Sequence, residues 1–338
     1  MTAYRFNRAF HLLAFSLLLL TTALFSSCDV GGDAGETAYV VPEKVRLRSS
    51  TAQAARVTSE LRGADEVTIT NRLDAEDGSL WVEVRGPAGE TGWAEARFFV
   101  AGDLVESSRR IAERYKSVRA QALGRSKAAL RLRLTPDRQS EENVAIVLPA
   151  GTMLEIVARE RRPRPATHTS GAEIDQSTFD PEQQFDDWLL VRIRDFSVVS
   201  TGWIYGGSVT IEIPPDIVYF ISNGRRITGW QKIGTATGED GRSGDHYLVL
   251  EEKTTDRNPE YDFDRIKVLA YDPVSHDYSV PFREDIVGRY PVTLDMAGSR
   301  GSFQLMSVDR QGRPREVSYR VELSDRSAIS VTKADPRR

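Results

Sequence analysis

Trp81-Val82-Glu83-Val84-Arg85 begins the most informative segment of this chain, and Thr91-Gly92-Trp93-Ala94 completes it. It returns as Trp188-Leu189-Leu190-Val191-Arg192 and Thr201-Gly202-Trp203-Ile204. In each copy a tryptophan opens an alternating strand, a turn follows, and Thr-Gly-Trp begins the next strand. Because an internal repeat marks one structural unit that is used twice, we predict two small β-domains.

The first copy extends outward from this stretch over residues 38–102. Val45-Arg46-Leu47-Arg48 alternates, with Val45 and Leu47 on one face. Asp77-Gly78 is a strong hairpin signal between two strands. Short strands separated by glycine-rich turns are typical of a small barrel, and we expect five of them between Tyr39 and Val100.

The second copy covers residues 125–214 and opens with Leu130-Arg131-Leu132-Arg133-Leu134. It differs from the first by a long polar insertion, residues 159–187, which starts with arginines and ends with Asp180, Glu182, Asp186 and Asp187. A loop of this length is uncommon in a compact domain. Two interpretations stay open, because the basic start can pair with the acidic end or the loop can contact a partner.

The succession Val45-Arg46-Leu47-Arg48-Ser49-Ser50, Trp81-Val82-Glu83-Val84 and Thr91-Gly92-Trp93 resembles the bacterial SH3 (SH3b) family over about 60 residues. Thr51 and Ala52 replace the Gly-Pro pair usual in that family. The resemblance implies two SH3-like barrels, each with a groove between the first loop and the hairpin that holds stem-peptide or glycan segments of peptidoglycan.

The repeat supplies the candidate ligand-binding residues, Trp81, Trp93, Trp188, Trp203 and Tyr205. Strand tryptophans of a small barrel most often fill the core, because each buries a large apolar area. The resemblance implies instead that part of each ring lines the groove. The departures between the copies, at Thr51-Ala52 and in the insertion, are further places where a specific ligand would bind.

Two regions flank the second copy. Residues 103–124 switch to helical spacing, which predicts a linker helix packed on one of the barrels. Residues 216–333 follow the diproline Pro214-Pro215 and show nine candidate strands, beginning with Ile217–Ile221, without a helical pattern. The fold class is therefore all-β, with a C-terminal antiparallel domain that is a sandwich, a barrel or a curved meander.

The N-terminus predicts export. Residues 1–27 combine Arg5 and Arg8 with an apolar run that is too short to span a bilayer, as in a signal peptide. Ser26-Ser27-Cys28 resembles the lipobox of bacterial lipoproteins, which implies lipidation of Cys28 and a membrane-anchored protein facing the periplasm. The following segment is glycine-rich and polar, which predicts a flexible tether over residues 28–37. The alternative is an ordinary cleaved signal with an incidental cysteine.

Composition excludes several functions. A formal net charge of −4 lacks the basic footprint that nucleic-acid binding needs. The single cysteine, Cys28, leaves no thiol nucleophile in the mature chain and no intramolecular disulfide. His168, His246 and His276 have no zinc-site spacing, so we expect neither a metal nor another cofactor.

We therefore expect a non-catalytic envelope protein whose tandem SH3b domains bind peptidoglycan or another envelope component. One alternative is a glycan-modifying enzyme that uses Asp262, Asp264 or His246 in the C-terminal domain, since paired carboxylates perform acid–base chemistry on sugars. Another alternative is a scaffold that binds only proteins.

Overall fold

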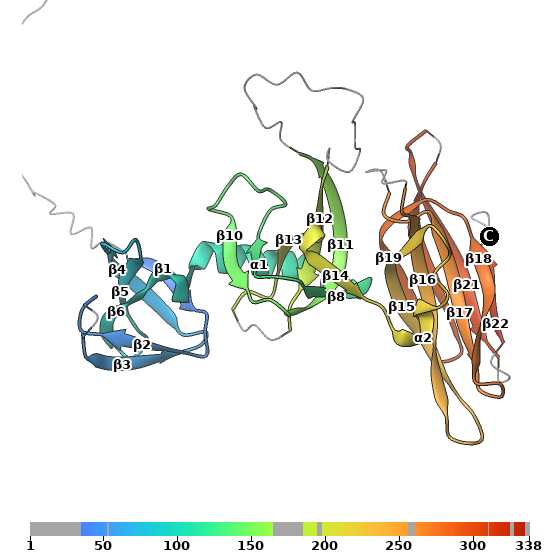
Figure 1. The fold of residues 1–338 in the computed structure, drawn as a ribbon, viewed down its shortest axis with the longest axis horizontal. Coiled ribbons are helices and arrows are strands. Elements are labelled where there is room, and N and C mark those ends of the chain that lie inside the picture. The colour runs from blue at the N-terminus through green and yellow to red at the C-terminus, as the bar shows by residue number, and fades with distance from the viewer. Residues whose placement is uncertain are drawn as a thin grey trace, which may run out of the picture. The chain divides into compact units, whose positions relative to one another are not determined.

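The two copies of the repeat fold into two seven-stranded antiparallel sheets with the same connectivity (Figure 1). The computed structural model describes residues 35–52, 54–164, 185–194, 198–255, 261–309, 311–324 and 328–334. The strand orders are β3-β2-β6-β5-β4-β1-β7 and β10-β9-β13-β12-β11-β8-β14, so adding seven to each label of the first sheet gives the second. The predicted all-β class is confirmed, and the repeat in the sequence is a repeat in topology.

We call these sheets the first and second β-units. The first β-unit contains β1 (Glu36–Val40), β2 (Lys44–Arg48), β3 (Val57–Arg62), β4 (Glu66–Asp74), β5 (Leu80–Arg85), β6 (Thr91–Glu95) and β7 (Phe99–Ala101). The second contains β8 (Ala122–Ser126), β9 (Leu130–Arg133), β10 (Val144–Leu148), β11 (Met153–Pro163), β12 (Phe185–Arg192), β13 (Thr201–Tyr205) and β14 (Val209–Glu212).

The glycine of each Thr-Gly-Trp lets two strands cross closely. A Cβ on Gly92 would lie 2.9 Å from the carbonyl oxygen of Arg48, and one on Gly202 would lie 2.7 Å from that of Arg133. Any larger residue would push β6 away from β2, or β13 away from β9. The motif is therefore a packing requirement of the sheet, independent of any ligand.

The C-terminal part is a β-sandwich of two four-stranded meanders. One sheet contains β15 (Arg225–Thr237), β16 (Ser243–Lys253), β17 (Arg265–Asp272) and β18 (Asp277–Glu284); the other contains β19 (Gly288–Ala297), β20 (Arg300–Val308), β21 (Pro314–Leu323) and β22 (Ile329–Lys333). Side chains from both sheets share one core, in which Phe303 stacks on Tyr319 with ring centroids 4.6 Å apart. Of the three predicted alternatives, the sandwich is the one observed.

Several expected boundaries were wrong. The first β-unit has seven strands instead of five, and β1 takes the last two residues of the expected tether, Glu36 and Thr37. The linker helix α1 (Gly102–Arg114) ends ten residues before the predicted limit of 124, because Ala122 already pairs in β8 with β11. Pro215 starts the short helix α2 (Pro215–Val218) where a strand was expected, as proline suits the first turn of a helix.

Helix α1 contacts β1 and β7 of the first β-unit as well as β13 of the second, whereas the sequence predicted packing on one barrel. Ile111 and Tyr115 contact a small apolar cluster around Leu190 and Trp203. The hydroxyl of Ser108 donates to the carbonyl oxygen of Thr201 at 2.7 Å and accepts from its N–H at 3.2 Å. Ser108 is buried, and its hydroxyl is satisfied by these two hydrogen bonds. They hold helix α1 against β13.

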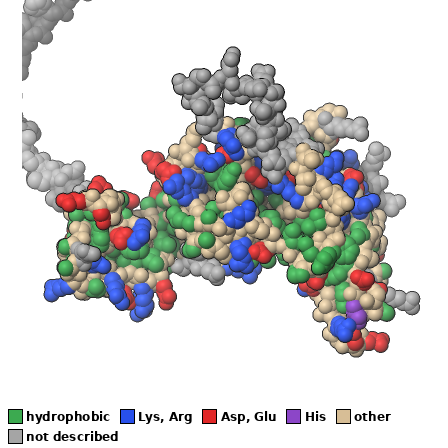
Figure 2. All heavy atoms as spheres, viewed as in Figure 1, with side chains coloured by type: hydrophobic (Ala, Val, Ile, Leu, Met, Phe, Trp, Pro, Cys, Tyr) green, Lys and Arg blue, Asp and Glu red, His purple; other side chains and the backbone are tan. Residues whose placement is uncertain are grey.

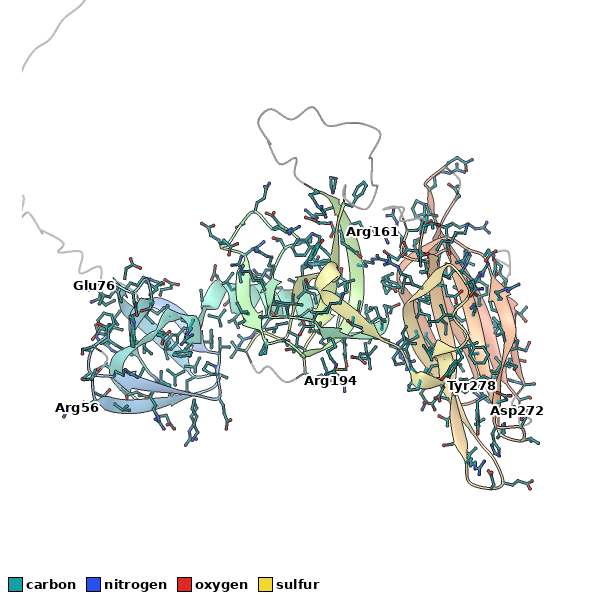
Figure 3. The ribbon with its side chains drawn as sticks, viewed as in Figure 1. Arg56, Glu76, Arg161, Arg194, Asp272 and Tyr278 are labelled. Carbon is teal, nitrogen blue, oxygen red and sulfur yellow. The ribbon has the colours of Figure 1, made fainter. Side chains whose placement is uncertain are left out.

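The segment after α1 joins the second β-unit to the sandwich. Gln121 is fully buried; its amide nitrogen donates to the carbonyl of Val292 at 3.1 Å, and its amide oxygen accepts from the N–H of Val292 at 2.7 Å. The indole of Trp230 donates to the carbonyl of Glu212 at 2.8 Å. In Figure 3, Arg161 of β11 faces the sandwich across the same contact.

Some sequence-based expectations lie outside the described residues. These are the signal segment, the lipidation site Cys28, most of the tether, His168 and the centre of the insertion, residues 165–184. In the part of the chain that the structure describes, no helix is both long and apolar enough to span a bilayer.

Candidate functional site

A groove of about 330 Å³ opens on the outer face of the first β-unit, with Trp81 in its wall. Alternation along β5 turns Val82 and Val84 into the core and Trp81 away from it, so Trp81 is half-buried outside the aliphatic core. The other residues that line the groove are Lys44, Val45, Arg46, Arg48, Glu60, Ala94, Glu95 and Phe98.

The ring of Trp81 is held in place from two sides. Its indole nitrogen donates to the hydroxyl of Ser79 at 3.0 Å, and Ser79 in turn bonds the carboxylate of Asp77 in the hairpin turn. Those hydrogen bonds from Ser79 lower the pKa of Asp77, which keeps its carboxylate ionised. The guanidinium of Arg48 lies over the ring, 5.9 Å from its centroid, at cation–π distance.

The charges around the groove favour an anionic ligand with apolar parts. Lys44 and Arg46 share one partner, Glu60, at 3.4 and 4.0 Å, and all three side chains are well exposed. Glu95 pairs instead with Arg97 at 2.7 Å. Ion pairs this exposed are weak, so Lys44 and Arg46 remain able to exchange Glu60 for the carboxylate of a ligand.

Trp93 and Trp203 occupy equivalent positions outside the two cores. Trp93 stands opposite Glu83 and Arg48 in the register of the sheet, and it does not line the groove. Trp203 stands opposite Leu190 and Arg133, and it packs in the small cluster under helix α1. Of the two tryptophans in the first copy, Trp81 thus lines this groove and Trp93 does not.

The second β-unit has the same site in a closed form. Trp188 takes the position of Trp81 but is only 2% exposed, and Tyr205, which replaces Glu95, lies edge-on to it with centroids 6.2 Å apart. The guanidinium of Arg138 covers Tyr205 at 4.7 Å and bonds Asp186 at 3.0 Å. A chain segment of the protein therefore fills the place that the first β-unit leaves open.

The closing segment is the loop 134–143, which connects β9 to β10 and is two residues longer than its counterpart 49–56. Arg133, the counterpart of Arg48, is 5% exposed and donates to the side chain of Asn143 at 2.8 Å and to that of Glu141 at 3.3 Å. Arg133 thus anchors its own loop, whereas Arg48 lies over Trp81.

The ends of the insertion pair with each other, which confirms one of the two sequence interpretations. β11 and β12 lengthen into an antiparallel arm in which Arg159 makes two 2.7 Å bonds to the carboxylate of Asp187. Arg164 bonds Asp186 at 3.1 Å. Two further bonds reach the sandwich, from Arg161 and Arg159 to the fully buried Glu252, at 2.9 and 3.4 Å.

Arg226 of β15 is the third arginine on Glu252, at 3.0 Å. We call Arg159, Arg161, Arg226, Asp187 and Glu252 the arginine clamp. Removing charges from water is costly, and several hydrogen bonds to one carboxylate are needed to offset that cost. The clamp meets this requirement for Glu252 and holds the base of the insertion on the sandwich.

The residues considered for catalysis in the sandwich do not converge. Asp262 accepts the N–H of Tyr290 at 2.7 Å, and Asp264 pairs with Arg225. Asp264 also lies beside Glu251, which is about 17 Å along β16 from His246.

The two described histidines lie toward the other end of the sandwich. His246 is buried, which lowers its pKa, and its Nδ1 accepts the N–H of Tyr271 at 3.0 Å. His276 lies between Tyr271 and Asp240, at 3.0 and 3.1 Å. Figure 3 shows Asp272 and Tyr278, which flank His276 in sequence, far from Arg161.

Basic and acidic side chains are interspersed on the face seen in Figure 2. Within the described ranges, no group of three or more His, Cys, Asp or Glu side chains is arranged to hold a metal ion.

No family model matches the chain, and no curated protein sequence matches it. The SH3b resemblance therefore depends on the quoted residues alone.

Sequence reasoning named Trp81 as one of five candidates and did not name the charged residues around the groove. The alternation of β2 carried the necessary information, since inward-facing Val45 and Leu47 imply that Lys44, Arg46 and Arg48 share the outer face. The sequence contains no comparable signal for the closed site of the second copy, because that closure depends on how the loop 134–143 folds over Tyr205.

Proposed function

We propose that the protein is a non-catalytic, lipid-anchored protein of the cell envelope that binds peptidoglycan through the groove of its first β-unit. The observation that carries the proposal is the open groove at Trp81, set against its closed counterpart at Trp188. The N-terminal signal and Cys28 support an envelope location, and the SH3b resemblance supports the ligand class.

The chemistry of the groove suits the stem peptide of peptidoglycan, which combines short apolar side chains with free carboxylates. Lys44, Arg46 and Arg48 supply cations for the carboxylates. Trp81 and Phe98 supply flat apolar surface for methyl groups or a sugar ring. A groove of about 330 Å³ lies at the small end of ligand sites and fits a few residues of peptide.

Co-sedimentation of the full-length chain with purified, protein-free sacculi tests this function. We expect wild-type protein to pellet with the sacculi, and Trp81→Ala and Arg48→Ala to lose most of that retention. Arg85→Ala is the matched control, since Arg85 is an exposed arginine of the same β-unit outside the groove.

Two results would count against the proposal in different ways. A wild-type chain that stays in the supernatant would reject peptidoglycan as the ligand. Full retention of Trp81→Ala and Arg48→Ala would reject the groove as the binding site. Because the sacculi carry no protein, neither result can be confused with binding to other envelope proteins.

A further inference from the structure

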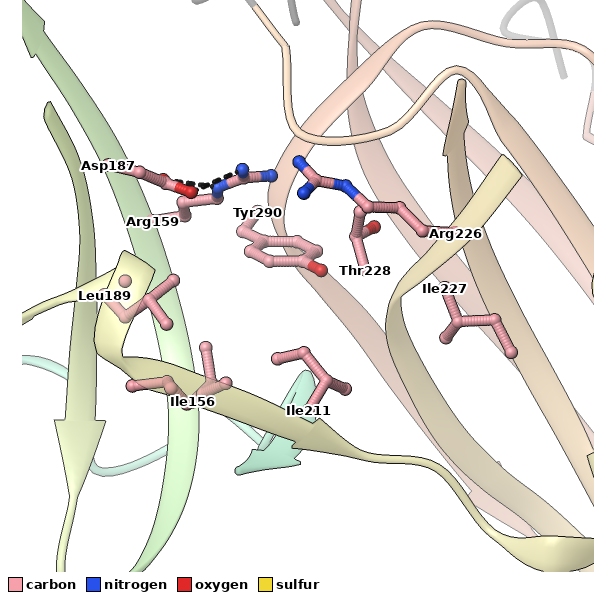
Figure 4. A pocket seen from close by; sticks show the side chains of 11 residues that line it. Ile156, Arg159, Asp187, Leu189, Ile211, Arg226, Ile227, Thr228 and Tyr290 are labelled. Carbon is pink, nitrogen blue, oxygen red and sulfur yellow. Dashed lines mark hydrogen bonds and ion pairs between the residues drawn. The ribbon is translucent and has the colours of Figure 1, made fainter. Parts of the chain in front are cut away.

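A second cavity lies where the second β-unit meets the sandwich, and it is independent of the groove at Trp81. Its volume is about 110 Å³ (Figure 4). Arg159 and Asp187 from the second β-unit and Arg226, Thr228 and Tyr290 from the sandwich form its polar side. Cavities near 150 Å³ hold a benzene-sized molecule, so this one fits about four to six non-hydrogen atoms.

The polar side has more hydrogen-bond donors than the protein uses. In Figure 4, the guanidinium groups of Arg159 and Arg226 point toward each other, with the ring of Tyr290 beside them. Among the described residues, no hydrogen bond of acceptable geometry reaches the Nε of Arg226 or the hydroxyl of Tyr290, although both atoms are buried. The hydroxyl of Thr228 is a polar neighbour of Tyr290 and opposes the rise in the pKa of Tyr290 that burial causes, but the geometry leaves the pair unbonded. Buried donors without partners are costly, and a ligand with acceptor oxygens would remove that cost.

The charges around the cavity also leave room for an anion. Arg159, Arg161 and Arg226 face the carboxylates of Asp187 and Glu252. Asp262 is the nearest further acid, and its burial raises its pKa and favours the uncharged form. Three guanidinium groups therefore share the carboxylates of Asp187 and Glu252, and one more negative charge would balance them.

The opposite wall of the cavity is aliphatic. Ile156, Leu189 and Val209 of the second β-unit and Ile227 of the sandwich are all buried, and Ile211 is partly buried. The side chains of Asp187 and Arg226 are 35% and 34% exposed, so the cavity opens to solvent on their side. A ligand entering there would place its charged end beside the arginines and its carbon chain against the isoleucines.

We propose that this cavity binds a small aliphatic carboxylate, either as a free acid of about three or four carbons or as the C-terminal residue of a peptide. The carboxylate accepts from the Nε of Arg226 and from the hydroxyl of Tyr290. The short carbon chain packs on Ile156, Leu189 and Ile211. Because residues of the second β-unit and of the sandwich both line the cavity, a bound ligand adds contacts between these two parts of the chain.

Ligand-observed NMR on the full-length chain, with propionate as the probe, tests the site. We expect saturation transfer to propionate and a weaker signal from propionamide, which has the same shape without the charge. Tyr290→Phe removes only the unpaired hydroxyl, so the fold is kept and the dissociation constant for propionate rises about tenfold. Tyr278→Phe is the matched control, because the hydroxyl of Tyr278 is also buried without a partner in the described structure but lies outside the cavity.

The source of the carboxylate is distinguished by alanyl-alanine and its C-terminal amide. Tighter binding of the free dipeptide than of propionate assigns the site to a peptide C-terminus, and the reverse order assigns it to a free acid. No transfer to propionate or the dipeptide, or equal binding by Tyr290→Phe and wild type, would overturn the proposal and leave a water-filled cavity. These outcomes do not depend on sacculus binding.

Discussion

The ring of Tyr205 lies edge-on to the ring of Trp188, with centroids 6.2 Å apart, at the position where the first β-unit places Glu95 opposite Trp81. Tyr205 in place of Glu95, together with Arg138 from the loop 134–143, thus converts an open groove wall into a covered aromatic pair. Two copies of one fold have diverged, so that one presents its tryptophan and the other buries it.

Alanine substitutions of the two equivalent tryptophans should affect different properties of the protein. Trp188→Ala removes a ring that is 2% exposed and should cost about 3–5 kcal/mol of unfolding free energy. Trp81→Ala removes a half-buried ring outside the core, so we expect a clearly smaller loss of stability and a large loss of sacculus retention. Urea unfolding and co-sedimentation on the same preparations measure both quantities, and equal stability losses would contradict the assigned roles.

The arginine clamp predicts that replacing one acid, Glu252, lowers the free energy of unfolding by a large amount. Glu252→Gln leaves Arg159, Arg161 and Arg226 facing one another in a buried site, and loss of one partner of such a network costs about 3–5 kcal/mol. Glu322→Gln is the matched control, since Glu322 is 64% exposed and pairs with Arg300 at 3.8 Å. We expect its effect on urea unfolding to be below about 0.5 kcal/mol. Similar effects of the two variants would argue against the clamp.

The lowered pKa of Asp187 predicts that part of the stability of the fold is lost at acidic pH. Burial alone would raise its pKa, but the two bonds from Arg159 outweigh burial and hold the pKa below its usual value. Its stabilisation is therefore complete above the unfolded pKa, about 3.9, and is lost as the pH falls through the lower folded value. Urea unfolding between about pH 2 and pH 5 should show a steeper acid loss for wild type than for Asp187→Asn.

The raised pKa of Asp262 predicts a contribution to stability that changes with pH in the opposite direction. Burial raises its folded pKa, so the native state holds a proton that the unfolded chain has already released. The stability contribution of Asp262 is thus largest below pH about 3.9 and declines as the pH rises through the folded value. Asp262→Asn, which keeps an acceptor for the N–H of Tyr290, should remove this decline in the same titration; an unchanged pH profile would contradict the assignment.

The glycine of the repeat is a final test of the fold. In Gly202→Ala the new Cβ would stand 2.7 Å from the carbonyl oxygen of Arg133, so β13 and β9 must separate. We expect a loss of roughly 1–3 kcal/mol in unfolding free energy, as for other overpacked sites. Gly92→Ala should behave alike in the first β-unit, because its contact with Arg48 is equivalent. An unchanged thermal midpoint for both variants would contradict the close crossing.

Much of the architecture follows from local pattern. The alternation Val82-Glu83-Val84 gave the inner and outer faces of β5, and eight of the nine strands expected in the sandwich are present. Boundaries failed where a tertiary contact overrode local periodicity. Residues 115–124 continue the helical spacing of α1, but pairing of Ala122 in β8 ends the helix earlier.

The two repeated units and their all-β class could be read from the sequence alone, because both depend on spacing along the chain, whereas the outward position of Trp81 was left open there. Long-range packing sets two further features: Tyr205 lies edge-on to Trp188 and is itself covered by Arg138, and Arg161 meets Glu252 across 91 residues. The physical reason is that exposure and charge pairing depend on which distant segments pack together. Alternation fixes the face on which a side chain lies, and packing decides whether that face stays open.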